Sequence, residues 1–403
     1  MSDAVDRTVF DHQGGTAAPW YRGWAISEEK REFFRARSKR SREAKLRALE
    51  GTQAPLHPLN VPALDPAELM PAVAPNDLGA LSLFSGGGGL DLGFERAGFD
   101  HVASCDTLEA AGMTLLQNRP TWTIRSGPDG DVRAVDWREY RGRIEVLHGG
   151  PPCQPFSTAG RQRGHTDERN MLPEFVRAVR EVRPRAFVAE NVPALAGQKF
   201  APYLKKAFLG PLSRHYRVVR FRLSAHEFGL PQVRHRVFFV GFLEETDAAR
   251  FILPSPTHRA DHLDRGPAAS IGGQSLTMGA REALGLPEAG FDALAPTLRS
   301  TLTGPRHTTS VLSSASAQRV WRELGIWPNG VAASRQSARS FPVENGDFRL
   351  SVADCAVLQG FPEHWAFHGA VYMALGQIGN SVAPPVAYRV GLAVAHALGA
   401  DTE

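Results

Sequence analysis

Short apolar runs alternate with glycine-containing turns and amphipathic stretches from about residue 80 to residue 250. Because each run is bounded by turn residues, we predict six strands, at residues 81–84, 101–105, 145–148, 186–189, 218–223 and 237–242. Helical spacing of apolar residues is found at 90–97, in a stretch ending near 118, and at 172–182. Strands that alternate with helices predict an α/β fold with a doubly wound, mainly parallel sheet.

The alternation stops at both ends of the chain and in a long insertion. Residues 27–50 predict a basic helix, and five prolines between residues 55 and 71 predict an extended linker. Residues 259–350 are rich in Gly, Ser, Thr and Pro, which predicts a smaller, irregular second domain before helical character returns at Ser351. We therefore expect an N-terminal extension (1–76), a main domain (77–258), an inserted domain (259–367) and a C-terminal return to the main domain (368–403).

Composition narrows the class of protein. With 403 residues, 42% hydrophobic and 22% charged, the chain has the composition of a soluble globular protein with more than one domain. The net charge is only +4, but the 46 Lys and Arg residues include just six lysines. Arginine is the better reader of phosphate and guanine, which suits a nucleic-acid partner, although the coding bias of a GC-rich genome explains the excess equally well.

Cysteine usage and hydropathy indicate the compartment. Cys105, Cys153 and Cys355 form no C-x-x-C pair, so we expect neither a disulfide framework nor a metal site. The N-terminus lacks the apolar segment of a signal peptide, and no apolar run reaches the length of a membrane span. We expect a soluble, cytoplasmic protein without a membrane contact.

Two turns carry candidate chemistry. Between Gly149 and Ser157, prolines flank Cys153 directly after a predicted strand, which projects the thiol from the rim of the sheet, where α/β folds bind ligands. A buried structural cysteine fits that stretch equally well. The glycine-rich turn from Phe84 to Leu90 follows the first strand and opens a helix, as do loops that hold dinucleotides, flavins or adenosyl cofactors.

Six short elements, in order along residues 80–398, resemble those of the cytosine-C5 DNA methyltransferases, bacterial modification enzymes that use S-adenosylmethionine. They are Phe84-Ser85-Gly86-Gly87-Gly88-Gly89, Pro152-Cys153-Gln154, Glu190-Asn191-Val192, Gln232-Val233-Arg234-His235-Arg236, Leu358-Gln359-Gly360-Phe361-Pro362 and Gly379-Asn380-Ser381-Val382. Each alone is a weak signal, but six in the family's order at suitable spacing are specific. The resemblance implies the S-adenosylmethionine-dependent methyltransferase fold, a catalytic main domain and a target-recognition role for the inserted domain.

The resemblance also implies covalent catalysis on a cytosine that is flipped out of duplex DNA. Cytosine C5 is a poor nucleophile, and a thiolate that adds to C6, supplied by Cys153, would turn the ring into an enamine. Glu190 would protonate or hydrogen-bond N3, a role that suits a carboxyl whose pKa is raised by burial. Arg236, and less securely Arg234, would hold the cytosine O2 and the charge of the adduct.

Further residues are implied at the cofactor and at DNA. Asp106 would accept from ribose hydroxyls and Asp131 from the adenine amino group, although either aspartate serves equally well as a turn or cap. The ribose position is commonly glutamate and the next is often a large side chain, whereas this chain has Asp106 and Thr107. The expected cofactor residues are Phe84, Gly86, Gly88, Gly89, Leu90, Asp106, Asp131, Pro152, Leu172, Asn380 and Val382. The expected DNA contacts are Gln154, Ser157, Arg161 and Arg163 in a closing loop, and Arg299 and Arg306 in the inserted domain, where a plain polar surface loop is an equally good interpretation.

Three other functions share part of this pattern. A tRNA cytosine-C5 methyltransferase has the same catalytic core but usually a short Cys-Phe-Thr signature, which this chain lacks. A non-catalytic DNA-binding regulator would not need Cys153, Glu190 and Arg236 together, and a dinucleotide oxidoreductase is supported by the glycine turn alone. We therefore expect a DNA (cytosine-5-)-methyltransferase of a restriction-modification system, acting as a monomer on double-stranded DNA. S-Adenosylmethionine would be the donor and S-adenosylhomocysteine the product, and a cognate restriction endonuclease would act separately.

Overall fold

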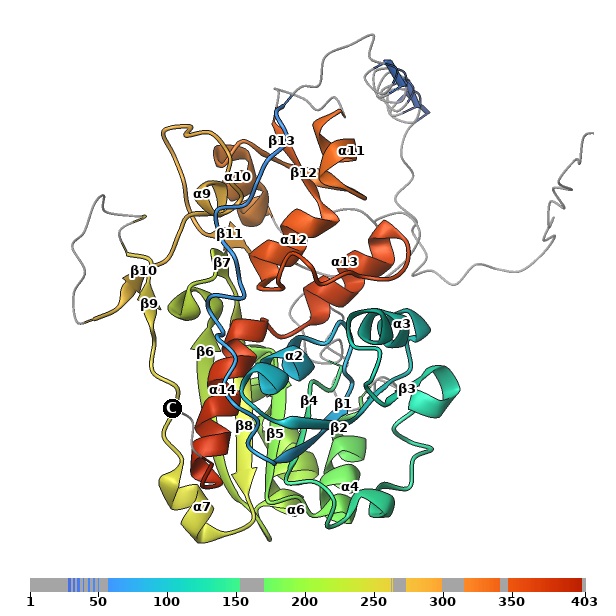
Figure 1. Cartoon of the computed structure of the whole chain (residues 1–403), viewed down its shortest axis with the longest axis vertical. Helices are drawn as coiled ribbons and strands as arrows, with labels where there is room; N and C mark the ends of the chain where they lie inside the picture. The colour runs from blue at the N-terminus through green and yellow to red at the C-terminus, as the bar shows by residue number, and fades with distance from the viewer. Residues whose placement is uncertain are drawn as a thin grey trace, which may run out of the picture. The chain divides into compact units, whose positions relative to one another are not determined.

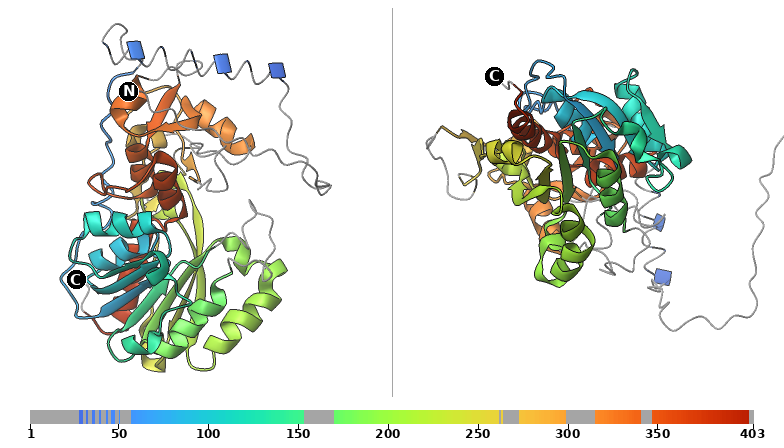
Figure 2. Two further views of the ribbon diagram at one scale, coloured as in Figure 1. Left: turned by 90° about the vertical axis from the view of Figure 1, so that its right-hand side faces the viewer. Right: turned by 90° about the horizontal axis from the view of Figure 1, so that it is seen from below.

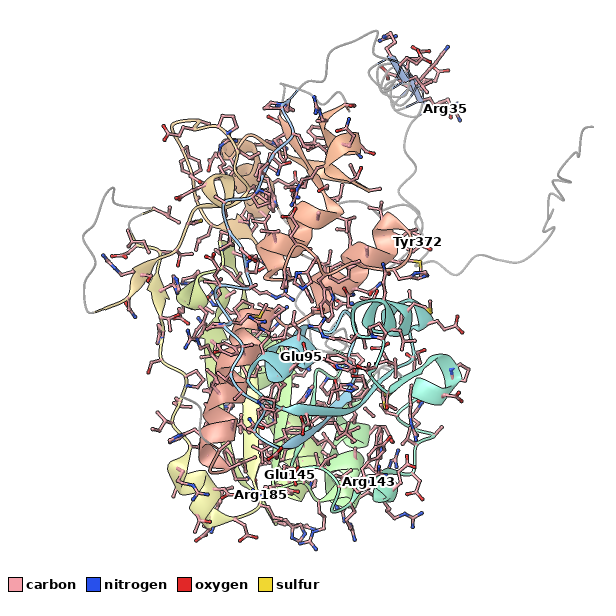
Figure 3. The ribbon with its side chains drawn as sticks, viewed as in Figure 1. Arg35, Glu95, Arg143, Glu145, Arg185 and Tyr372 are labelled. Carbon is pink, nitrogen blue, oxygen red and sulfur yellow. The ribbon has the colours of Figure 1, made fainter. Side chains whose placement is uncertain are left out.

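The computed structural model describes residues 57–152, 170–261, 263, 273–298, 315–340 and 347–400, and ten single positions between 28 and 50. Contacts divide the chain into two units, Met1–Gln53 and Ala54–Glu403. In the first unit the described positions from Glu28 to Arg47 are helical, and Arg35 Nη1 pairs with Glu28 Oε1 at 3.2 Å (Arg35 is labelled in Figure 3).

A seven-stranded sheet in the order β3-β2-β1-β4-β5-β8-β6 forms the lower half of the second unit as drawn in Figure 1. Its strands are β1 (Gly79–Leu83), β2 (Asp100–Asp106), β3 (Ile124–Ser126), β4 (Val146–Gly149), β5 (Ala186–Asn191), β6 (Arg217–Ser224) and β8 (His235–Phe242). Strands β1 to β5 are parallel, and β8 is antiparallel to both β5 and β6. The six predicted strands and the doubly wound, mainly parallel sheet are confirmed, and the short edge strand β3 was missed.

Helices cover both faces of this sheet (Figure 2). Because side chains alternate along a strand, Val146 and Val188 enter the core on one face, and Leu147 and Phe187 enter the core on the other. The first core is covered by α2 (Gly89–Arg96) and α14 (Pro384–Ala397), and the second by α4 (Leu172–Val182), α5 (Ala201–Leu204), η6 (Lys205–Leu209) and α6 (Gly210–Leu212). The remaining helices around the sheet are α3 (Glu109–Asn118), η1 (Gly127–Gly130), η2 (Trp137–Tyr140), η4 (Pro193–Ala196), η5 (Gln198–Phe200), η7 (Ala225–Phe228) and α7 (Glu245–Arg250).

One arginine ties the C-terminal helix to the sheet. Arg185, which immediately precedes β5 and is labelled in Figure 3, donates to Leu398 O at 3.1 Å and pairs with Asp247 of α7 at the same distance. The last helix of the chain therefore packs on the domain that the first strands build. Among the described residues, every helix is too short or too polar to span a bilayer.

Short elements make up the described part of the inserted region. Three two-stranded sheets pair β7 (Gln232–Val233) with β11 (Ala295–Pro296), β9 (His258–Arg259) with β10 (Ser275–Leu276), and β12 (Ile326–Ala332) with β13 (Phe348–Ser351). The helices are α9 (Ala280–Ala283), α10 (Ala315–Glu323), α11 (Arg335–Arg339) and α12 (Val352–Gln359), and α13 (Val371–Asn380) follows in the C-terminal segment. Ser351 caps α12 in a reciprocal capping box with Asp354, which confirms the predicted helix start.

Residues 57–76 pack tightly on the rest of the second unit. Asn60 Nδ2 donates to Leu284 O at 3.1 Å and to Asp354 Oδ1 at 3.0 Å. Met70 is fully buried, and its carbonyl accepts from Arg96 Nε at 2.7 Å. The proline spacing predicted only an extended path here, and it gave no sign of these core contacts.

Candidate active site

The turn after β1 is built on left-handed backbone conformations. Gly86 and Gly88 have φ of 53° and 84°, and Phe84, with φ of 57°, adopts a conformation that side chains rarely permit. Gly89 begins α2, and a Cβ at this position would lie 2.1 Å from Val382 O. The turn therefore sets the N-terminus of α2, whose first N–H groups have no partner within the helix, against the C-terminal GNSV element.

Asp106 ends β2 beside this turn. Its Oδ2 accepts a hydrogen bond from Gly86 N and its Oδ1 accepts one from Leu108 N, both at 2.8 Å. Burial raises the pKa of this carboxyl, and the two N–H donors oppose the shift. A carboxylate accepts at about four lone-pair positions, so Asp106 retains capacity for hydroxyl donors.

Glu190 and Arg236 meet at the edge of the sheet where β5 ends and β8 begins. Arg236 Nε lies 2.7 Å from Glu190 Oε1, and the two side chains are 14% and 8% exposed. Burial raises the pKa of Glu190, and the charges of Arg236 and Arg234 oppose that shift only in part. The pair thus includes a buried carboxyl that is easier to protonate than an exposed glutamate.

Arg234 has different surroundings, although it lies only two residues before Arg236. Its guanidinium donates to Leu298 O at 3.1 Å, to Gly379 O at 2.8 Å and to Ser381 O at 2.7 Å. The residue is 2% exposed. These contacts join the guanidinium to backbone carbonyls, two of them in the GNSV element, and the cytosine contact suggested by the sequence stays a prediction.

Hydrogen bonds join the sequence elements to one another. Gln232 Nε2 donates to Leu358 O at 2.8 Å and to Gln359 Oε1 at 3.1 Å. Gln359 Nε2 in turn donates to Ser381 O at 2.8 Å. Trp365 Nε1 donates to the carbonyl of Gly87 in the glycine turn at 3.1 Å. Elements that lie far apart in the sequence therefore form one hydrogen-bonded frame.

A cavity of about 620 Å³ lies at the carboxyl edge of the sheet. The strand order reverses here between β1 and β4, which is where doubly wound sheets bind ligands. Glu190 and Arg236 line this cavity, whereas Gly88 and Leu172 pack behind it. The other predicted cofactor residues also line it: Phe84, Gly86, Gly89, Leu90, Asp106, Asp131, Pro152, Asn380 and Val382.

Sequence reasoning missed part of the lining. Asp131 pairs with Arg133 at 2.6 Å, which lowers the pKa of the Asp131 carboxyl, and the arginine lines the cavity as well. Gln377 lies one helical turn before Asn380 on α13, so helical spacing could have identified it. The other missed lining residues flank predicted ones in sequence or space: Ser85, Thr107, Leu108, Gly130, Val132, Gly150, Pro151, Met171, Val192, Gly376, Gly379 and Ser381.

Seven of the predicted residues, Cys153, Gln154, Ser157, Arg161, Arg163, Arg299 and Arg306, lie outside the described residues. The segment that leads into Cys153 is fixed, because Asn191 Nδ2 donates to Pro151 O at 3.0 Å. Pro151 and Pro152 both line the cavity that contains Glu190. Within the described ranges, no group of three His, Cys, Asp or Glu side chains is arranged to hold a metal ion.

Comparison with known proteins identifies the family. A family model described as C-5 cytosine-specific DNA methylase matches residues 78–279 and 296–396. Type II methyltransferase M.NgoMIV of Neisseria gonorrhoeae is 34% identical over 79% of this chain and 97% of its own length. M.NaeI of Lentzea aerocolonigenes, another Type II methyltransferase, is 32% identical over 81% of this chain and 76% of its own.

A solved structure agrees at the level of the fold. The methyltransferase EhMeth of Entamoeba histolytica matches with a TM-score of 0.50 and 14% identity over 80% of this chain and 99% of its own. The family model covers the central sheet and the C-terminal helices, and the M.NgoMIV match extends over nearly all of that relative. The chain therefore belongs to the C-5 cytosine-specific DNA methylase family.

Proposed function

We propose that this protein transfers a methyl group from S-adenosylmethionine to C5 of a flipped-out cytosine in a specific sequence of duplex DNA. The observation that carries the proposal is the buried Glu190–Arg236 pair, which lines the same cavity as the glycine turn and Asp106. One cavity thus offers a carboxyl and a guanidinium for a base, and a loop suited to an adenosyl ligand.

The reaction needs a nucleophile at cytosine C6, because C5 attacks a methyl donor only after the ring has become an enamine. In the proposal Cys153 forms that bond, while Glu190 donates a proton or hydrogen bond to N3 and withdraws electron density from C5–C6. Arg236 holds O2 and the charge of the adduct. After transfer, a base removes the C5 proton, the C6–sulfur bond breaks, and aromaticity returns. Asn191 supports this arrangement by holding Pro151, and hence the turn before Cys153, next to Glu190.

The cavity has features that suit S-adenosylmethionine, which supplies a methyl group on a sulfonium centre when bound. A Cβ on Gly86 would meet no neighbour nearer than 4.0 Å, so this lining glycine borders open space. Asp106 offers acceptors for ribose hydroxyls, and Asp131, now paired with Arg133, offers one for the adenine amino group. Phe84, Leu90 and Val382 add apolar walls.

The DNA partner follows from the family, and we propose the finer assignments below. Residues 259–367 would read the sequence, with Arg299 and Arg306 contacting bases or phosphates. Gln154, Ser157, Arg161 and Arg163 would close over the flipped cytosine. M.NgoMIV and M.NaeI are Type II methyltransferases. We propose the same class for this protein, acting in a bacterial cytoplasm as the modification partner of a separate endonuclease.

The experiment is methyl transfer from labelled S-adenosylmethionine to plasmid DNA and to bulk tRNA in parallel, followed by nucleoside analysis. The proposal predicts label in DNA as 5-methylcytosine, and bisulfite sequencing of that DNA then gives the recognised site. Label in tRNA alone would establish the RNA-modifying alternative. An absence of label in both, together with tight DNA binding, would establish a non-catalytic regulator.

A further inference from the structure

One stretch of the chain is far more basic than the rest. Between Glu190 and Glu244 there are nine Lys and Arg residues and a single acidic residue, Glu227. The net charge of the whole chain is only +4, so the remainder is acidic on balance. Glu227 is half-buried, and its Oε2 accepts from Ser224 N at 2.9 Å in a helix cap. Half of the six lysines of the chain lie in this stretch.

Four of these basic residues are exposed on one side of the sheet. We call them the basic face: Lys205, Lys206, Arg220 and Arg222. On the edge strand β6, Arg220 lies opposite Phe239 of β8, and Arg222 lies opposite Val237. Residues directly opposite in antiparallel strands point to the same side. Phe239 and Val237 enter the core beneath α4 and η6, so both arginines stand on that side of the sheet.

The two lysines come from the helical stretch that covers the neighbouring strand. Phe208, on the buried side of η6, has its ring centroid 5.3 Å from that of Phe239. Because Arg220 is the β6 partner of Phe239, this helical stretch lies next to the strand arginines. Lys205 and Lys206 are on its exposed side. Among the described residues, no acidic side chain forms an ion pair with Lys205, Lys206, Arg220 or Arg222.

The basic face begins beside the cavity. Arg236, which lines the cavity, lies opposite Leu223, which follows Arg222 on β6 and points to the other side of the sheet, so Arg222 stands at the end of β6 that is level with the cavity. On the helical side, Val192 lines the cavity, and the chain runs from it through η4 and η5 into α5. Adjacent strands are about 4.8 Å apart, and side chains on one side of a strand are about 7 Å apart. The basic face therefore extends away from the cavity along β6 and across to the helical stretch.

We propose that the basic face binds the phosphates of duplex DNA that flanks the target base, outside both the cavity and the inserted region. This inference rests on the proposed function, which makes duplex DNA the substrate. When basic side chains without acidic partners neutralise phosphates, the counterions held by the DNA are released. The binding that these side chains supply therefore depends on salt concentration. Contacts of this kind fix the enzyme on the duplex without reading its sequence.

Two double variants with the same loss of charge test the inference. Arg220→Gln/Arg222→Gln removes half of the basic face. Arg180→Gln/Arg183→Gln removes two exposed arginines at the C-terminal end of α4, which precedes β5 and therefore lies at the sheet edge opposite the cavity. Binding to a labelled mixed-sequence duplex is measured by anisotropy from about 50 to 200 mM salt. The slope of log K against log salt should decrease by about 1 to 2 for the first variant and remain at the wild-type value for the second.

Activity measurements keep this inference distinct from the proposed function. In the basic-face variant, kcat at saturating plasmid DNA and the Kd of S-adenosylmethionine should be unchanged, while KM for DNA rises roughly tenfold. Adding Lys205→Gln/Lys206→Gln should reduce the salt slope further. Equal slopes for the two double variants would overturn the inference, even if the wild-type enzyme methylates DNA. Failure of the wild-type enzyme to methylate DNA would instead overturn the proposed function.

Discussion

Arg236 Nε lies 2.7 Å from Glu190 Oε1, and the two side chains are almost entirely removed from solvent. Burial outweighs the arginine charge, so the pKa of Glu190 is raised despite the contact. Protonated, this carboxyl can donate to cytosine N3, with the guanidinium of Arg236 in contact beside it. The relationship between these two residues gives the cavity its capacity to activate a base.

Glu190→Gln should lower kcat by about 10²- to 10⁴-fold, because an amide cannot deliver a proton to N3. The wild-type rate should decline as pH rises through the raised pKa of Glu190, and the variant should lack that part of the profile. Single-turnover methyl transfer across the pH range, with cofactor affinity measured alongside, tests both expectations. A variant with the wild-type rate and profile would exclude Glu190 from the chemistry.

Asp106→Ala should raise the Kd of S-adenosylmethionine by roughly 10- to 100-fold, since a hydrogen bond to a charged group contributes about 1.5–3 kcal/mol. Asp106→Glu keeps the carboxylate and should recover most of the affinity. Titration calorimetry on the three proteins makes the comparison, with unfolding curves as a check on the turn that Asp106 supports through Gly86. Unchanged affinity in the alanine variant would disprove the ribose role.

Arg234→Met should lower the free energy of unfolding by about 3 kcal/mol, because it leaves buried carbonyls without donors. The displaced GNSV element should raise KM for S-adenosylmethionine more than it lowers kcat, since Asn380 and Val382 line the cavity. Denaturant unfolding and steady-state kinetics provide the two readouts. Full stability with a loss confined to kcat would indicate instead that Arg234 acts directly on the cytosine.

Asp91 on α2 should make stability depend on pH. It is 3% exposed, accepts from Ser104 Oγ at 2.5 Å, and burial raises its pKa to about 6. The folded protein holds this proton to higher pH than the unfolded chain does, so the stabilisation present at low pH is lost as pH rises through about 6. Between about pH 5 and pH 8 the loss should be roughly 1 kcal/mol. Asp91→Asn should remove it in urea unfolding; an unaltered pH dependence would refute the assignment.

The sequence predicted those parts of the site that follow from local pattern. Glu190 ends a strongly apolar strand, and parallel strands bring their carboxyl ends to one edge, so its meeting with the glycine turn and Asp106 could be anticipated. The backbone contacts of Arg234 could not. In a continuous strand, Arg234 and Arg236 would point to the same side because they are two residues apart. Arg234 instead falls in the break between β7 and β8, where this alternation of side chains does not hold.

The packing of residues 57–76 also could not be predicted from the local sequence pattern. Proline spacing indicates an extended path, but the hydrogen bonds of Asn60 reach Leu284 and Asp354, which are 224 and 294 residues away in the sequence. Gln377 differs from these contacts, because helical spacing on α13 places it on the same side as the predicted Asn380.

The central claim is that Cys153 forms a bond to C6 of the target cytosine. A duplex with 5-fluorocytosine at the mapped site tests it, because fluorine at C5 cannot leave as a proton and the adduct should persist. After incubation with S-adenosylmethionine, intact mass analysis should find protein, DNA strand and one methyl group joined in a denaturant-stable complex. Cys153→Ala should bind the same duplex and form none. A complex of equal yield in the variant, or none from a wild-type enzyme that methylates the unmodified site, would contradict the account.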